Sequence, residues 1–162
     1  MESSSIVYRP TQLIAEEFQR ADIKFTVLFN DEHKAEILKC CISIIGGPRA
    51  DVCFISNDNK NDVIIRIGGL ITAVTDEKRA SLLAAFNEIH LETPYCTFSL
   101  AKNGDINVGT ILSEFISDEC LGKSALVILV RLNQILNQKY SIIAKALYSD
   151  PIRSTANTPQ DK

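Results

Sequence analysis

The chain has 162 residues, of which 46% are hydrophobic and 23% charged, a composition typical of an ordinary globular domain and not of a disordered or fibrous protein. Lys and Arg number 17 against 20 Asp and Glu, for a net charge of -3, so the sequence lacks the clustered basic excess that nucleic-acid binding requires. Its longest uncharged stretches are about half as long as a membrane-spanning helix. We therefore expect no nucleic-acid partner and no membrane partner.

The two ends and the cysteines indicate one domain in a reducing compartment. Residues 1–6 lack the basic region and apolar stretch of a secretory signal. We expect residues 1–7 to be a flexible start, residues 149–162 to be a polar, disordered tail, and a single domain to cover residues 8–148. The cysteine count of five is odd, and most of these thiols lie in apolar runs where a thiol behaves as a small hydrophobe. These features favour the cytoplasm.

The first half of the chain predicts one helix followed by four strands. Apolar residues recur at helical spacing through residues 10–22. The spacing then changes to two, which predicts strands; they cover residues 23–30, 38–44, 50–56 and 63–74. The third of these is apolar on both faces, as a central strand is. The fourth contains Gly68-Gly69, where we expect a bulge.

The second half predicts a helix, a hairpin and a long final helix. Thr75 is the expected N-cap of the second helix, and Pro94 prevents its continuation. Strands at residues 95–101 and 105–112 follow, and Ser117 then caps a helix that runs to about residue 148. The resulting order, α-β-β-β-β-α-β-β-α, predicts an α+β fold with an antiparallel sheet.

The hairpin register follows from the pattern of apolar residues. A two-residue Asn-Gly loop would pair Leu100 with Asn107 and mix the two faces. A three-residue loop pairs Leu100 with Ile106 and Phe98 with Val108, which keeps the apolar residues together. We predict the three-residue form, with Gly104 in the left-handed conformation.

The sequence offers few residues for catalysis or metal binding. Its two histidines, His33 and His90, are not brought together by any motif, which argues against a metal site or a Ser-His-Asp site. Gly-rich phosphate-binding motifs are absent. The helix dipole makes Cys120 the thiol most favoured for reactivity, although we expect it to be inert. We therefore predict no enzyme activity, no cofactor and no metal.

The final helix has more apolar surface than one sheet face can bury. Residues 125–130 are apolar all round, so either a neighbouring helix of the same chain covers the excess or it forms a dimer or partner surface. The candidate association residues are Leu126, Val127, Val130, Leu132 and Leu136. Arg66, the one charge in an otherwise apolar strand, is either structural or part of a recognition surface.

Several short segments occur in an order that resembles a known family. They are residues 50–58, Asp62-Val63 with Arg66, residues 77–79 with Leu83, Phe86 and Asn87, and residues 104–108, 117–120 and 146–148. Together they resemble the YbjN family of small bacterial proteins, described as sensory transduction regulators, whose fold is similar to that of type III secretion chaperones. The resemblance covers about residues 8–148 and supports the fold more than any activity.

The resemblance implies a non-enzymatic module, chaperone-like or regulatory, that binds a partner polypeptide as a homodimer. The alternative is a small-ligand or signal-sensing domain. In that case an apolar pocket lies between the sheet and the final helix, and Arg66 is the polar contact that orients the ligand.

Overall fold

The computed structural model describes residues 6–148, which form three helices and six strands. The helices are α1 (Arg9–Arg20), α2 (Asp76–Glu92) and α3 (Asp118–Tyr148). The strands are β1 (Phe25–Asn30), β2 (Ala35–Ser43), β3 (Arg49–Ser56), β4 (Val63–Ile71), β5 (Thr97–Leu100) and β6 (Ile106–Leu112). The α+β class and the predicted order of elements are confirmed.

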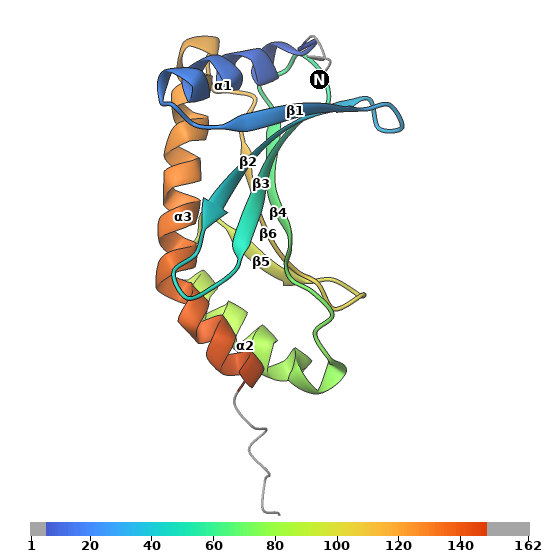
Figure 1. Cartoon of the computed structure of the whole chain (residues 1–162), viewed down its shortest axis with the longest axis vertical. Coiled ribbons are helices and arrows are strands. Elements are labelled where there is room, and N and C mark those ends of the chain that lie inside the picture. The colour runs from blue at the N-terminus through green and yellow to red at the C-terminus, as the bar shows by residue number, and fades with distance from the viewer. Residues whose placement is uncertain (1–5, 149–162) are drawn as a thin grey trace, which may run out of the picture.

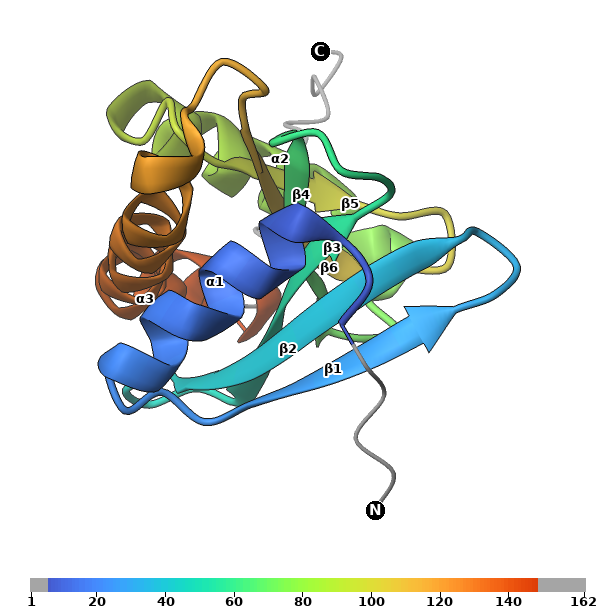
Figure 2. The ribbon, with the colours of Figure 1, turned by 90° about the horizontal axis from the view of Figure 1, so that it is seen from above.

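The strands form one antiparallel sheet in the order β1-β2-β3-β4-β6-β5. α3 runs along the sheet, with α1 across one end and α2 at the other (Figure 1). The view from above places α1 and α3 on the same side of the strands (Figure 2). Buried side chains of all three helices share a core with one face of the sheet, so within residues 6–148 the opposite face carries no helix. No helix in this part of the chain is long and apolar enough to cross a bilayer.

Aromatic pairs join the helices to the covered face. Phe18 of α1 meets Phe54 of β3 edge-on, with ring centroids 5.3 Å apart. Phe86 of α2 lies 5.8 Å from Phe98 of β5. Such pairs contribute about 0.5–1.5 kcal/mol beyond the burial of their area, so they help to fix where α1 and α2 rest on the sheet.

Neighbouring helices cover much of the apolar surface of α3. Gly122 allows α1 to approach closely, because a β-carbon at this position would lie 2.6 Å from the Leu13 carbonyl oxygen. Near the other end, Lys139 forms an ion pair with Glu92 of α2. Val127 and Val130 nevertheless remain 50% and 48% exposed. Part of the excess is therefore buried within the chain, and part faces outward.

The hairpin has the predicted register. Leu100 pairs with Ile106 and Phe98 with Val108, and Gly104 has a φ of 87°. A β-carbon on Gly104 would lie 2.6 Å from the Val74 carbonyl oxygen, so both the backbone conformation and the lack of space favour glycine there. The bulge is also confirmed, because the register between β4 and β6 shifts between Ile67 and Ile71.

The second strand begins earlier than its polar sequence indicates. β2 starts at Ala35 and includes Glu36, whose side chain is buried. The two carboxylate oxygens of Glu36 accept hydrogen bonds from the backbone N–H groups of Val7 and Tyr8, at 2.6 and 2.9 Å. A carboxylate is favoured beside the start of α1 by the helix dipole, so a charged residue extends the strand to a position before residue 38, where the alternation predicted its start.

The edge strand β5 is bonded to α2 through a side chain. His90 accepts a hydrogen bond at Nε2 from the backbone N–H of Phe98, at 2.8 Å. The ring also lies 6.1 Å from the Phe98 ring, centroid to centroid. His90 therefore has a structural contact at the end of the sheet.

Candidate functional site

The uncovered face of the sheet, here called the open face, carries a row of apolar residues across five strands. The pairs Leu28–Ile37, Ile37–Ile55, Ile55–Ile64 and Ile64–Ile111 place these residues side by side. We call Leu28, Ile37, Ile55, Ile64 and Ile111 the apolar row. Its two ends are the most exposed, with Leu28 at 54% and Ile111 at 64%. Apolar side chains gathered in this way on a free face are typical of an interaction site.

A polar row lies next to the apolar row on the same face. Its successive cross-strand pairs place Thr26, Lys39, Cys53, Arg66, Gly109 and Thr97 in line. Within it, the Lys39 ammonium bonds the Asp51 carboxylate at 2.7 Å. The hydrogen bond and the charge of Asp51 raise the pKa of Lys39 above its usual value, so Lys39 stays charged and its charge is matched locally.

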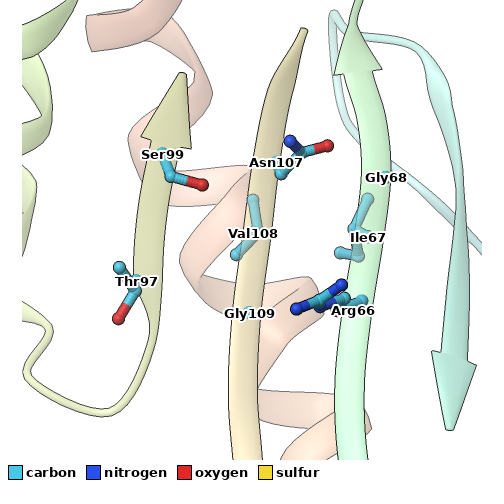
Figure 3. Close-up of a pocket in the computed structure, with 8 residues that line it drawn as sticks. All are labelled: Arg66, Ile67, Gly68, Thr97, Ser99, Asn107, Val108 and Gly109. Carbon is cyan, nitrogen blue, oxygen red and sulfur yellow. The ribbon is translucent and has the colours of Figure 1, made fainter. Parts of the chain in front are cut away.

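A hollow of about 380 Å³ opens on this face over β4, β5 and β6. Figure 3 looks onto it with a helix behind the sheet, and shows the Arg66 side chain reaching from β4 toward β6. Ser99 on β5 points its hydroxyl toward β6, and the Asn107 amide lies between β6 and β4 (Figure 3). Asn107 Oδ1 accepts a hydrogen bond from the Gly69 N–H at 2.9 Å, which leaves its amide N–H₂ group as a donor.

Two glycines keep the hollow open. Gly109 lies between Arg66 and Thr97 in the polar row, and Gly68 lines the same hollow. A β-carbon at Gly109 would come no closer than 3.8 Å to its nearest neighbour, and one at Gly68 no closer than 3.9 Å. Neither residue has a positive φ. The fold therefore tolerates a side chain at both positions, although glycine weakens a strand.

Arg66 also borders a second hollow on the apolar side. This hollow, of about 380 Å³, is lined by Ile37, Ile55 and Ile64 of the apolar row together with Arg66 and polar residues of nearby loops. The guanidinium thus stands between a polar hollow and an apolar one. Within residues 6–148, no carboxylate forms an ion pair with Arg66.

A separate groove of about 330 Å³ lies between β6 and α3. Its walls include Ile128, Leu132 and Ile135 of α3 and the end of β6, at Thr110 and Ile111. This end of β6 pairs with β4 but extends past the residues that pair with β5. At the rim, the Arg131 guanidinium lies over the Tyr95 ring, 5.7 Å from its centroid, an arrangement that favours a cation over an aromatic face.

The residues predicted to form an association surface are not all exposed. Leu132 and Leu136 are 3% and 0% exposed, so they belong to the chain's own core and a partner cannot reach them. Leu126 is partly buried and packs against that core. The sequence could not separate these residues from Val127 and Val130, because the all-apolar stretch has no polar face to orient the helix.

Arg66 lies on the other side of the sheet from its expected place in a ligand pocket. Its neighbours Ile65 and Ile67 point into the core, so Arg66 itself is on the open face and does not enter the space between sheet and helices. The groove that does exist there has Arg131 as its cation. The expected pocket with Arg66 between sheet and α3 is therefore wrong in that form.

The thiols and histidines do not form a reactive cluster. Burial raises the pKa of Cys40 to about 12, and burial also raises the pKa of Cys53 and of Cys96. Cys41 and Cys120 are exposed. Within residues 6–148, no group of three or more His, Cys, Asp or Glu side chains is placed to hold a metal ion.

No family model matches the sequence of this chain, and no curated protein matches it either.

Proposed function

We propose that this protein is a non-enzymatic interaction module that binds a partner polypeptide on the open face of its sheet. The observation that carries the proposal is the apolar row, which crosses five strands on a face that no helix of residues 6–148 covers. Apolar residues at adjacent positions of a free sheet face offer a continuous contact surface for an extended segment or a second sheet. The proposal agrees with the role that the resemblance to chaperone-like regulators implies, and it adds the surface where the partner binds.

The chemistry of the partner follows from the surface. Side chains of the apolar row require an apolar face on the partner, and the polar row beside it requires hydrogen-bonding groups along one edge. A polypeptide segment with apolar side chains provides both, because its backbone N–H and C=O groups supply the hydrogen bonds.

Substitution at the two ends of the apolar row tests the proposal. Leu28→Glu with Ile111→Glu places charge at exposed positions where the fold loses little. The matched control is Leu83→Glu with Leu91→Glu on α2, whose apolar side chains are 47% and 88% exposed. Each tagged protein is cross-linked briefly in source lysate, and the retained proteins are compared by mass spectrometry.

We expect the parent and the α2 control to retain the same specific proteins, and the variant of the apolar row to lose them. Each retained protein is then purified and titrated against the three proteins, and the apolar-row variant should bind at least about tenfold more weakly. Equal retention by the apolar-row variant contradicts the proposal. Capture of no specific protein by the parent contradicts it as well.

A further inference from the structure

Arg66 carries a charge that the described chain does not neutralise. No acidic side chain of residues 6–148 forms an ion pair with it. Asp51, on the adjacent strand β3, is bonded to Lys39 at 2.7 Å. A guanidinium in a hollow with hydrogen-bond donors around it presents its fork to an anion from outside the chain.

The other groups of the polar hollow define the charge of that anion. Ser99 contributes a hydroxyl and Asn107 contributes an amide N–H₂ group, and Thr97 lines the same hollow. These groups are neutral, so the site carries a single positive charge. A carboxylate matches it with one negative charge and two oxygens for a bidentate contact. A phosphate dianion would remain unbalanced.

The glycines give this anion its space. Gly68 and Gly109 are required neither by their backbone conformation nor by close neighbours, yet both line the hollow. Glycine within a strand frequently marks a place where a ligand approaches the backbone. The volume, about 380 Å³, is within the range of about 300–1,000 Å³ found for small-molecule sites.

The apolar hollow on the other side of Arg66 defines the rest of the ligand. Ile37, Ile55 and Ile64 line it together with Arg66. We propose that the open face binds a carboxylate at Arg66 whose apolar substituent lies against Ile55 and Ile64. A free apolar acid and the terminal residue of a polypeptide share this chemistry, so the inference goes beyond the binding of a polypeptide partner.

Titration with N-acetyl-L-leucine tests the site in the full chain. Isothermal calorimetry gives the affinity, and backbone amide shifts of Gly68, Asn107 and Gly109 report the location. N-acetyl-L-leucinamide lacks the charge, and acetate lacks the apolar group; we expect each to bind at least about tenfold more weakly. Equal binding of the amide, or of acetate, overturns the proposal.

Two variants test the contacts in different ways. Arg66→Gln removes the charge, and Gly109→Val fills the hollow where a β-carbon meets nothing closer than 3.8 Å. Each should weaken binding at least about tenfold, while circular dichroism and the free energy of unfolding show that the fold is kept. The control is Arg49→Gln, which removes an exposed charge at the start of β3. A loss in this control as large as that in Arg66→Gln overturns the site.

A peptide that ends in leucine with a free carboxylate separates the two sources of the ligand. Binding at least about tenfold tighter than N-acetyl-L-leucine assigns the site to a polypeptide end, and equal affinity assigns it to a free acid. Failure of every titration removes this site. It leaves the apolar-row test intact, because that test does not involve Arg66.

Discussion

Among single residues, Glu36 is a buried carboxylate that accepts two backbone hydrogen bonds. It is 1% exposed, and its two oxygens hold the backbone just before α1. We predict that Glu36→Ala lowers the free energy of unfolding by about 2–4 kcal/mol, because two N–H groups lose their acceptors. Urea denaturation followed by circular dichroism measures the change.

The paired variant Glu36→Gln separates charge from shape. It keeps one acceptor oxygen but turns an N–H₂ group toward the second backbone donor, so its loss of stability should fall between those of the parent and Glu36→Ala. A loss below about 0.5 kcal/mol for Glu36→Ala, the level of an ordinary surface change, would show that the contact contributes nothing.

The thiols provide a second prediction for single residues. With an alkylating reagent near pH 8, Cys41 and Cys120 should react in the folded protein, and Cys40 and Cys96 on the order of tenfold more slowly or only after unfolding. Peptide mass spectrometry over time measures each rate. Cys120 reacting far faster than Cys41 would reopen the idea of a functional thiol.

The raised pKa of Cys40 also makes the stability of the fold depend on pH. Burial disfavours its thiolate, so its contribution to stability is complete below the ordinary value of 9.0 and is lost as the pH rises toward about 12. Replacing Cys40 with alanine should remove this part of the alkaline dependence.

For the packing of elements, the contact between α1 and α3 depends on Gly122. A β-carbon there would lie 2.6 Å from the Leu13 carbonyl oxygen and 2.9 Å from the Glu17 β-carbon. We predict that Gly122→Ala lowers the free energy of unfolding by about 1–3 kcal/mol, since the helices must separate. This outweighs the gain of about 1 kcal/mol that alanine normally brings to a helix. Chemical denaturation measures the sum of the packing loss and the gain in helix propensity.

The neighbouring position provides the control for Gly122. Lys123→Ala lies one residue along α3 at an exposed position and should change the stability by less than about 0.5 kcal/mol. An increase in stability for Gly122→Ala would mean that the helices do not pack this closely in solution.

The helices and strands could be predicted from the sequence wherever an element has one apolar face and one polar face. Leu100 and Ile106 could be paired correctly because a shift of register would have mixed the faces. Gly122 gave no such signal, because its importance depends on a helix distant in the sequence. Glu36 lay just before the predicted second strand, residues 38–44, since alternation says nothing about a charge bonded inside the fold. The sequence marked Arg66 as an unusual charge in an apolar strand. It could not show which face of the sheet Arg66 lies on or that Gly109 lies beside it, because both depend on the pairing of β4 with β6.

For the whole molecule, the exposed part of α3 supports the predicted homodimer. Val127 and Val130 are each about half exposed on a helix that runs the length of the sheet (Figure 1). We predict a mass near twice 17.9 kDa by light scattering. Val127→Glu with Val130→Glu should give the monomer, because charges are excluded from an apolar interface.

The variant of the apolar row provides the comparison for the dimer. Leu28→Glu with Ile111→Glu should keep the dimer if α3 is the contact between copies. A monomeric mass for the parent at every concentration contradicts the dimer, and a monomer produced only by the apolar-row variant assigns the contact to the sheet.

Residues 149–162, predicted to be disordered, lie outside the residues that the structure describes.

The bond between His90 and Phe98 protects the outer edge of the sheet. Nε2 accepts from the Phe98 N–H, in the direction from which the carbonyl of a further strand would otherwise come. The amide of this edge strand should therefore exchange with solvent hydrogen as slowly as an amide inside the sheet. Replacing His90 with alanine removes the acceptor and frees that amide. The same change that opens the edge to solvent would open it to another strand.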